Sequence, residues 1–348
     1  MDEIKKRATI KDIAERTGFS IATVSRVLNK KGLFYSTKTF EKIQKAIKEL
    51  DYHPDAIARG LKTQKTFNIA FLEPWISDFF SEVFLGVQDA ANEAGYSVAI
   101  FSSNCDKEQE KRNVNVILSN RIDGVIISSA ILDKLNLLRI INQKIPVVAI
   151  EKIADDVSMP CITIKNKEVS RKAVEYLVKL GHKRIGFVSE PLDVGNLINR
   201  FKGYKEALVN NGLSFDESIV FIDEAFRGEK YQSCYNYMKK NMEKIKSCTA
   251  LFITADEIAI GAMKALNDGG IMVPEDISII GFDGLELSKF LIPSLTSIVQ
   301  PRYEMGFKAM ELLLNLIDGK SAESIELKAE FLIGGSTAEP PKIKINNK

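Results

Sequence analysis

From Phe67 onward, the sequence alternates short apolar runs with longer stretches in which apolar residues recur at helical spacing. The runs FNIAFLE, GVIISS and PVVAIE are typical of buried strands, and after CITIK the pattern restarts with RIGFVSE, ALFIT and ISIIGFD. Repeated strand–helix units favour parallel sheets covered by helices on both faces. Two such series predict two Rossmann-like lobes. The chain length agrees, since 348 residues are too many for one ordinary hydrophobic core.

The N-terminal segment TIKDIAERTGFSIATVSRVLN contains two short helical patterns held apart by three residues. Thr9 is placed to cap the first helix, Gly18 to end it and Ser20 to cap the second. So short a turn makes the helices cross steeply, as in a helix-turn-helix unit. A third helix, capped by Ser36, is expected to face inward with Phe40, Ile43, Ala46, Ile47 and Leu50. The second helix then presents an outward face of the size that fits the major groove of DNA.

The charge is distributed unevenly along the chain. Residues 1–62 hold 14 Lys and Arg against 8 Asp and Glu, a net charge of +6, whereas the remaining 286 residues carry −4. A basic head on a slightly acidic body indicates a polyanionic partner at one end only.

Several classes of protein are disfavoured by composition. The four cysteines form no C-x-x-C pair and there are only two histidines, so neither a metal site nor a histidine-based catalytic site is expected. No phosphate-binding glycine motif is present, so no nucleotide cofactor is expected, and His182 is interpreted as a structural turn residue. No apolar run is long enough to span a membrane and the first ten residues lack a signal-peptide core, so a cytoplasmic protein with no membrane partner is expected.

The stretch ATIKDIAERTGFSIATVSRVLN, followed by LDYHPDAIARGLKT, resembles the head of the lac repressor family (LacI/GalR). The likeness continues through LGHKRIGFV, ADEIAIGAMKAL, VPEDISIIGFD and LTSIVQPRYEMG. It implies a small all-α helix-turn-helix head followed by an α/β periplasmic-binding-protein-like core of two Rossmann-like lobes, without enzymatic activity.

The resemblance also implies a division of the chain into four parts. The head is expected at 1–53, a hinge helix and linker at 54–65, the effector-binding and dimerisation core at 66–340, and a tail at 341–348. Within the core, the N-lobe is expected at about 66–163 and 293–323, and the C-lobe at about 164–292 and 324–340.

The residues expected to contact DNA follow from the same resemblance. Ile21, Ala22 and Arg26 occupy the base-reading positions, and Arg26 is the best candidate for a guanine contact. Ala58 and Leu61 match the hinge helix, where a leucine wedges into the minor groove. The remaining residues expected to support docking are Thr9, Ser20, Thr23, Ser25 and Asn29.

A ligand cleft between the lobes is implied as well. Arg200 matches the arginine that grips the effector, Asp283 the acid that accepts from ligand hydroxyls, and Phe226 an aromatic platform. The other expected effector contacts are Trp75, Phe79, Glu151 and Asp256. By contrast, Phe80 is expected to pack in the core. Ala255 and Lys165 replace a common asparagine and aspartate, which favours an anionic or otherwise atypical ligand.

The sequence therefore predicts a transcriptional regulator, a repressor that binds a pseudo-palindromic operator as a homodimer and responds to a sugar or sugar derivative. Its dimer surface is expected to include the helix near residues 84–94. A competing hypothesis is a catabolite-control-type regulator that needs a phosphorylated carrier protein; VQPRYEMG resembles that branch, but Glu311 stands where a basic contact is expected. A solute-binding protein is disfavoured by the helix-turn-helix head, and an enzyme such as a sugar kinase by the lack of a phosphate loop.

Overall fold

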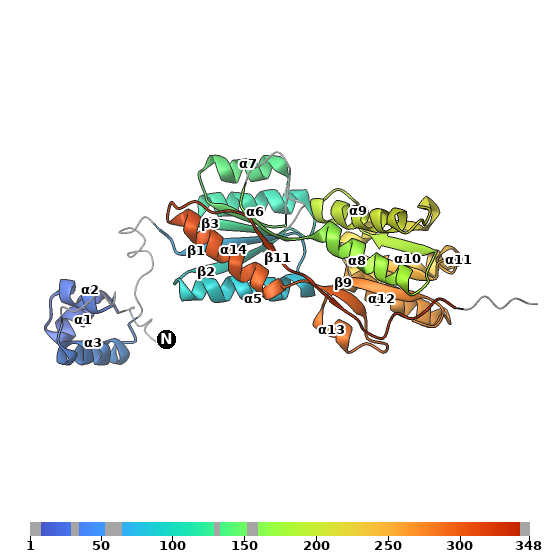
Figure 1. Cartoon of the computed structure of the whole chain (residues 1–348). Coiled ribbons are helices and arrows are strands. Elements are labelled where there is room, and N and C mark those ends of the chain that lie inside the picture. Colours follow the sequence, from blue (N-terminus) through green and yellow to red (C-terminus); the bar gives the residue numbers. More distant parts are fainter. Residues whose placement is uncertain (1–7, 29–34, 53–64, 129–132, 152–158, 342–348) are drawn as a thin grey trace, which may run out of the picture. The chain divides into compact units, whose positions relative to one another are not determined.

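The computed structural model describes residues 8–28, 35–52, 65–128, 133–151 and 159–341 (Figure 1). The chain divides into two compact units, Met1–Phe67 and Asn68–Lys348. Most of the expected hinge segment, 54–65, lies outside the described residues.

The N-terminal unit is a bundle of three helices, α1 (Ile10–Thr17), α2 (Ile21–Leu28) and α3 (Thr37–Glu49). The first helix begins with a capping box, in which Thr9 and Asp12 bond reciprocally, and ends at Gly18 with φ 72°. Both features confirm the boundaries expected from the sequence. A small core holds the three helices together: Ile13, Val24, Val27, Ile43, Ala46 and Tyr52.

One residue of this unit departs from expectation. Phe40 was expected to face the core, but it is 38% exposed and its ring stacks on Tyr35 with centroids 6.1 Å apart. The helical period places Ile43 and Ala46 on the buried face. Phe40 therefore lies at the margin of the core, against the residue that precedes the α3 cap.

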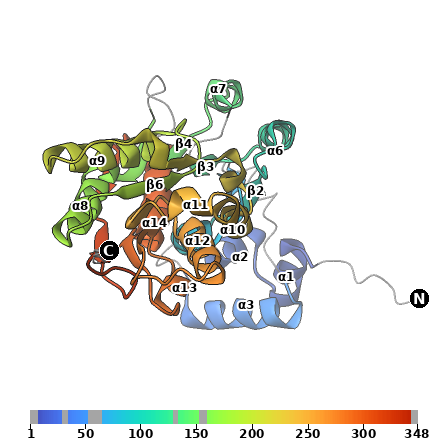
Figure 2. The same cartoon turned by 90° about the vertical axis from the view of Figure 1, so that its right-hand side faces the viewer.

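The first lobe of the second unit is built on a six-stranded sheet of order β11-β5-β4-β3-β1-β2, in which every neighbouring pair is parallel. The strands are β1 (Asn68–Glu73), β2 (Ser97–Ser102), β3 (Gly124–Ser128), β4 (Val147–Ile150), β5 (Cys161–Ile164) and β11 (Ile325–Leu327). The helices are α5 (Asp78–Glu93), α6 (Lys107–Ser119), α7 (Lys134–Asn142) and α14 (Arg302–Ile317). Helices α5 and α14 pack on each other (Figure 1), as do α6 and α7 (Figure 2).

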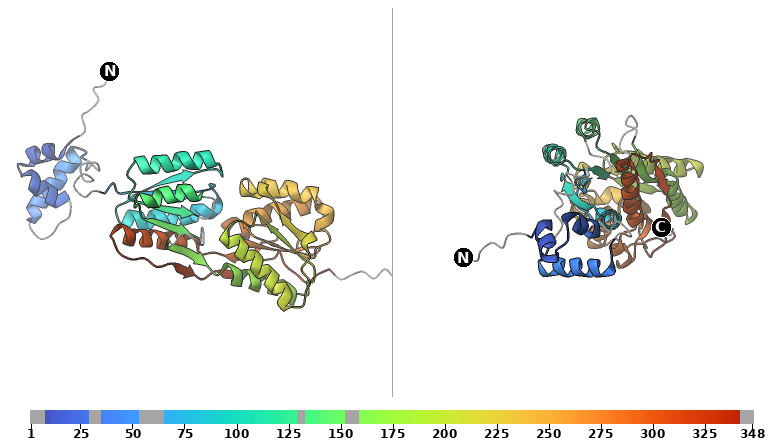
Figure 3. Two further views of the ribbon diagram at one scale, coloured as in Figure 1. Left: turned by 90° about the horizontal axis from the view of Figure 1, so that it is seen from above. Right: turned by 90° about the vertical axis from the view of Figure 1, so that its left-hand side faces the viewer.

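The second lobe has a sheet of order β12-β10-β9-β8-β6-β7, parallel except for β12. Its strands are β6 (Ile185–Ser189), β7 (Val220–Ile222), β8 (Ala250–Ile253), β9 (Ser278–Asp283), β10 (Thr296–Val299) and β12 (Glu330–Leu332). Its α-helices are α8 (Asn166–Lys179), α9 (Gly195–Asn210), α10 (Lys230–Lys240), α11 (Met242–Ile245), α12 (Asp256–Asp268) and α13 (Glu286–Lys289), with 3-10 turns η1 (Glu217–Ile219) and η2 (Glu224–Arg227). One face of this sheet carries α10 and α12 and the other α8 and α9 (Figure 3).

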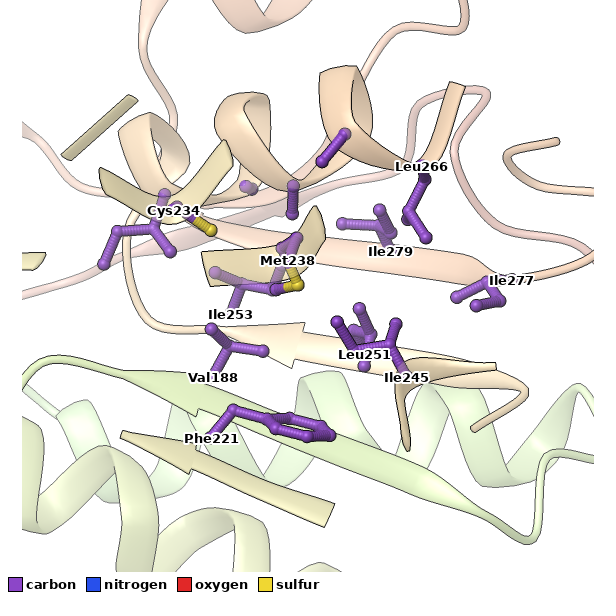
Figure 4. Packing of buried hydrophobic residues seen from close by; sticks show 14 of the residues in the cluster. Val188, Phe221, Cys234, Met238, Ile245, Leu251, Ile253, Leu266, Ile277 and Ile279 are labelled. Atoms are coloured by element: carbon purple, nitrogen blue, oxygen red, sulfur yellow. The ribbon is translucent and has the colours of Figure 1, made fainter. Parts of the chain in front are cut away.

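The apolar spacing of α10 and α12 explains why they cover this sheet. Cys234 and Met238 lie one turn apart on α10 and are fully buried against Leu251, Ile253 and other strand residues (Figure 4). Full burial of one such side chain stabilises the fold by about 1.5–3 kcal/mol. This cluster fixes α10 and α12, and hence the loops that precede them at the sheet edge.

The chain crosses between the lobes three times, after β5, after β10 and after β11. The expected lobe boundaries are therefore corrected in two places. The stretch 293–323, assigned to the N-lobe, contains β10, which pairs with β9; the stretch 324–340, assigned to the C-lobe, begins with β11, which pairs with β5. Strands of three and four residues do not reveal from their own sequence which sheet edge they will join.

In the part of the chain that the structure describes, no helix is long and apolar enough to cross a membrane.

Candidate DNA-reading helix and interlobe cleft

The outward face of α2 carries the three side chains expected to read bases. Ile21 is 45% exposed, and Ala22 and Arg26 are exposed as well, whereas Val24 and Val27 are buried. The helical period separates these two sets, so the core holds α2 by one face and leaves the other open. The exposed set presents two apolar groups and one guanidinium.

The ends of α1 and α2 are organised by hydroxyl groups. The Ser20 Oγ accepts a hydrogen bond from the Thr23 amide at 3.2 Å and lies 2.9 Å from the Thr23 hydroxyl. Ser25 is half-buried, and Thr9 is exposed with its hydroxyl 2.8 Å from the Asp12 carboxylate. These contacts give Thr9 and Ser20 a capping role; their contact with DNA stays a prediction. Three other expected DNA contacts, Asn29, Ala58 and Leu61, lie outside the described residues.

A cleft lies between the two lobes of the second unit, at the carboxyl ends of the parallel strands, where open α/β sheets bind ligands. The first lobe lines it with Pro74, Trp75, Ser77, Phe79, Phe80, Cys105, Ile150 and Glu151. The second lobe and the crossover after β10 line it with Glu190, Val194, Asn196, Leu197, Arg200, Arg227, Lys230, Ala255, Asp283 and Gln300. Aromatic side chains thus come from one lobe, and most charged ones from the other.

Arg200 extends from α9 into the cleft and is 4% exposed. Its Nε donates to the Asn166 Oδ1 at 3.0 Å, and its Nη1 donates to the Thr254 carbonyl at 2.7 Å. The guanidinium also lies 3.6 Å from the centre of the Phe282 ring, which is cation–π geometry. These contacts fix the orientation of the side chain before any ligand contact is made.

Glu151 follows β4 with φ 67°, a left-handed conformation that turns the chain sharply at the cleft. Its carboxylate accepts from the Thr163 hydroxyl at 2.8 Å and from the Asn166 amide at 3.1 Å. Burial raises the pKa of Glu151 above its ordinary value, and Arg200 opposes that shift. Asn166 therefore joins Glu151 and Arg200 into one network.

Asp283 and Gln300 form a second polar pair in the cleft. The Gln300 Nε2 donates to the Asp283 Oδ1 at 2.8 Å, while the Gln300 Oε1 is buried and has no hydrogen-bond partner. Burial raises the pKa of Asp283, and Arg200 and Lys230 counteract it. A buried amide oxygen without a donor is costly, so a ligand N–H or O–H placed against it is favoured.

Two of the three cations that line the cleft form ion pairs with carboxylates. Arg227 pairs with Asp193 and, at 2.7 Å, with Glu224; Lys230 lies 3.3 Å from Glu190 and 3.9 Å from Glu257. Burial alone would lower the pKa of Lys230, but these two glutamates raise it. The lining residues comprise three cations and three carboxylates, so the cleft has no excess positive charge.

The expectation of an anionic ligand loses its main premise. Lys165 does not line the cleft: its side chain is 58% exposed and pairs with Glu168 at 3.8 Å and Glu326 at 3.6 Å. Only the second departure, Ala255, lines the cleft.

Two predicted effector contacts are corrected by the structure. Phe226 is fully buried in the second-lobe core, with its ring centre 5.2 Å from that of Tyr237, and does not line the cleft. Asp256 is also fully buried, and it accepts from the Ser297 hydroxyl at 2.7 Å and the Leu285 amide at 2.8 Å. Its carboxylate therefore fastens α12 to β10 and to the segment after β9.

Five of the residues expected to contact the effector line the cleft: Trp75, Phe79, Glu151, Arg200 and Asp283; their contact with an effector stays a prediction. Phe80 lines it too, contrary to the expectation of core packing, and its ring meets that of Phe79 edge-on at 5.0 Å. The sequence interpretation missed further polar lining residues: Glu190, Asn196, Arg227, Lys230 and Gln300. For all of these except Arg227, which ends η2, the position after a strand or at a helix start was the available signal.

Among the described residues, no group of three or more His, Cys, Asp or Glu side chains could hold a metal ion. His182 bonds to Thr249, Ser278 and the Ala338 carbonyl within the second lobe, at distances of 2.9–3.1 Å. It does not line the interlobe cleft.

Comparison with known proteins assigns both parts of the chain to known families. Residues 9–55 match the family described as bacterial regulatory proteins, lacI family, and residues 174–337 match a periplasmic binding protein-like domain. Catabolite control protein A of Priestia megaterium is 34% identical over 318 residues, covering 91% of this chain and 94% of that protein. The transcriptional repressor CytR of Escherichia coli K12 is 33% identical over 338 residues, covering 96% and 97%.

Solved structures agree. The lac repressor dimer bound to operator and the anti-inducer ONPF matches with a TM-score of 0.81 and 27% identity, covering 96% of this chain and all of that one. The regulator CelR in complex with cellobiose matches with a TM-score of 0.71 and 25% identity, covering 95% of this chain and all of that one.

A helix-turn-helix head joined to a two-lobed, periplasmic-binding-protein-like core defines a DNA-binding transcriptional regulator, not an enzyme. The chain belongs to the lacI family of bacterial regulatory proteins.

Proposed function

We propose that this protein is a cytoplasmic repressor that binds a pseudo-palindromic operator as a homodimer and is controlled by a small molecule in the interlobe cleft. The observation that carries the proposal is the exposed face of α2, which presents Ile21, Ala22 and Arg26 on a helix held by its opposite face. A small ligand then acts by favouring one arrangement of the two lobes over another.

Arg26 is the proposed reader of guanine, because its planar guanidinium can donate to both O6 and N7. Selection from a random DNA pool with the purified protein, without added ligand, is expected to enrich a palindrome. Arg26→Ala is expected to weaken binding to the enriched sequence by about 1–3 kcal/mol, the discrimination typical of a bidentate contact. Arg26→Lys is the matched control, since it keeps the charge but loses the fork.

The salt dependence separates the two contributions. Arg26→Lys is expected to relax sequence preference while leaving the salt slope near the wild-type value, because the number of charges near phosphates is unchanged. Enrichment of no sequence at all, with a steep salt slope, would refute unaided operator recognition. That outcome favours the catabolite-control hypothesis, in which a phosphorylated carrier protein is required.

Little in the described structure favours the catabolite-control hypothesis beyond the likeness to catabolite control protein A. Glu311, which stands where a basic partner contact was expected, pairs with Lys308 at 2.7 Å on α14. The pair is electrically neutral and leaves no unmatched cation at this position, so it does not attract a phosphorylated partner.

Two surfaces support the proposed homodimer. In the second lobe, a groove between α10, α12 and the segment before β10 is lined by apolar side chains that include Ile260, Met263 and Leu291, and Ile292 beside it is 99% exposed. In the first lobe, Leu85 on α5 is 48% exposed. Exposed apolar patches of this kind mark interfaces. Sedimentation of Ile292→Asp against wild type is expected to show a concentration-dependent shift toward monomer.

The proposed ligand is a neutral polyhydroxylated molecule, a sugar or sugar derivative. The support is the balance of charge in the cleft, the aromatic wall of Trp75, Phe79 and Phe80, and the unpartnered Gln300 Oε1. A phosphate would need an unmatched cation, but Arg227 and Lys230 are paired with carboxylates, and the charge of Arg200 is balanced by the nearby Asp283 and Glu151. In a thermal-shift screen, neutral sugars and nucleosides are expected to stabilise the protein more than their phosphorylated forms.

A further inference from the structure

Arg302 begins α14, directly after the chain crosses from the second lobe to the first, and its side chain contacts both lobes. Its Nη1 donates to the Asp283 carbonyl at 2.5 Å, and its Nε donates to the Glu82 Oε2 on α5 at 2.8 Å; its Nη2 also donates to Glu82. The Arg302 side chain is 7% exposed. Removing a partner from a buried charge is costly, so the guanidinium depends on its bonds to both lobes.

The second-lobe partner of Arg302 belongs to the cleft itself. Asp283 lines the cleft. Its backbone carbonyl accepts hydrogen bonds from the backbone N–H of Gln300 at 3.2 Å and from the Arg302 side chain. Asp283 has φ 117°, an unusual conformation for any residue but glycine. The surrounding contacts must hold this backbone in place. A ligand that bonds to the Asp283 carboxylate therefore acts on the same short segment that Arg302 grips.

The first-lobe partner lies on a helix whose N-terminus also meets the second lobe. Asp78, the first residue of α5, accepts a hydrogen bond from the Tyr231 hydroxyl at 2.7 Å. Glu82 lies one helical turn further along α5. The start of α5 is thus bonded to the second lobe through Asp78 and, by way of Arg302, through Glu82.

Helices α5 and α14 are in backbone contact at two glycines. A Cβ at Gly86 would lie 2.1 Å from the Tyr303 carbonyl oxygen, and a Cβ at Gly306 would lie 1.8 Å from the Val83 carbonyl oxygen. Because the two helices are packed this closely, a displacement of α5 is expected to displace α14 as well. A change at the Arg302–Glu82 pair therefore reaches the whole helical face of the first lobe.

We propose that Arg302 is a positioning residue that couples the cleft to α5: it ties the Asp283 backbone of the second lobe to Glu82 of the first and stabilises the lobe arrangement seen here. Its effect on operator affinity rests on the proposed function; its effect on the lobes does not. Loss of the Glu82 charge shifts the lobe equilibrium toward other arrangements.

Trp75 provides the readout, since it is the single tryptophan of the chain and lines the cleft two residues before Ser77. Acrylamide quenching of its fluorescence measures access to the cleft in the full-length protein. Glu82→Gln keeps the size of the side chain and removes its charge. Glu286→Gln is the matched control, because Glu286 pairs with Lys289 at 2.7 Å on the second-lobe surface and does not line the cleft.

Glu82→Gln is expected to shift the lobe equilibrium by about two- to fivefold and so change the quenching constant, while Glu286→Gln leaves it at the wild-type value. In an Arg302→Met background, Glu82→Gln is expected to add nothing further, since the two residues act as a pair. Unchanged quenching in a Glu82→Gln protein with a wild-type circular dichroism spectrum would overturn the proposal.

Operator binding gives a second measurement. On the sequence enriched from the random pool, Glu82→Gln is expected to change affinity by a similar factor without altering the salt slope, because no phosphate contact is touched. If wild type binds no specific sequence but quenching responds to Glu82→Gln, the proposed function fails and the coupling stands. If wild type binds its operator and neither quenching nor affinity responds, the coupling is wrong.

Discussion

Replacing Arg200 tests how the charges of the cleft are balanced. Arg200→Met keeps an apolar stem of similar length but removes the guanidinium from between Glu151 and Asp283. The substitution deletes hydrogen bonds to Asn166 and to the Thr254 carbonyl, and the contact with the Phe282 face. It removes the cation that most lowers the pKa values of two buried carboxylates, although Lys230 and Arg302 still act on Asp283.

The magnitude follows from these losses. Each charge-assisted hydrogen bond contributes about 1.5–3 kcal/mol, and the cation–π contact adds up to about 2 kcal/mol because the site is desolvated. The burial of Arg200 itself is relieved, which offsets part of the loss. Removing one partner of a buried charge network costs about 3–5 kcal/mol, so about 4 kcal/mol of unfolding free energy is expected to be lost at pH 8.

The loss is expected to depend on pH. Burial raises the pKa of Glu151 and of Asp283 in the folded state, and removing Arg200 raises both further. An acid whose pKa is raised by folding binds protons more tightly in the folded state, so stability falls as pH rises from its unfolded pKa to its folded pKa. At pH 5.5 more of the variant's carboxyls are neutral, and the loss is expected to shrink to about 2 kcal/mol.

Urea unfolding followed by Trp75 fluorescence and by circular dichroism, at pH 5.5 and pH 8, measures both values. Lys264→Met is the control, because it breaks the exposed Lys264–Asp268 pair and is expected to cause no measurable change. A loss at pH 8 below about 1.5 kcal/mol, or an equal loss at both pH values, would refute the view that Arg200 compensates buried carboxylates.

Two further predictions concern the first lobe. Gly306→Ala places a Cβ 1.8 Å from the Val83 carbonyl oxygen, so α14 must move away from α5. Urea unfolding is expected to show a loss of about 3 kcal/mol in unfolding free energy. Gly319→Ala is the control, because its Cβ meets no atom within 4 Å and the substitution tests only the local cost of a positive φ. Burial raises the pKa of Glu73 to about 7, so stability from this residue falls as pH rises from about 4.5 to 7. Glu73→Gln is expected to be neutral at pH 5 and stabilising by about 2 kcal/mol at pH 8, after allowance for partial solvation, and a difference that does not grow with pH contradicts it.

Local sequence determined the head and most of the sheets. Thr9 and Gly18 set the ends of α1 because capping and positive φ depend on residues a few positions apart. The separation of Val24 and Val27 from Arg26 followed from the helical period. Strands β1, β3, β4 and β9 were visible as apolar runs, since parallel strands are buried on both faces.

The tertiary structure decided which sheet received β10 and β11, and which side chains reached the cleft. Phe226 is buried in the core while its neighbour Arg227 lines the cleft. The sequence could not predict this difference, because the four-residue turn η2 is too short to show a periodic apolar pattern. Asp256 has a structural role because the fold brings Ser297 and Leu285, from other parts of the second lobe, within hydrogen-bond distance of its carboxylate. Lys165 pairs with Glu326, more than 150 residues away in the sequence, and does not contribute its charge to the cleft. These partners are far apart in the sequence and are brought together only when whole helices and strands pack, so the residues next to each position do not reveal them.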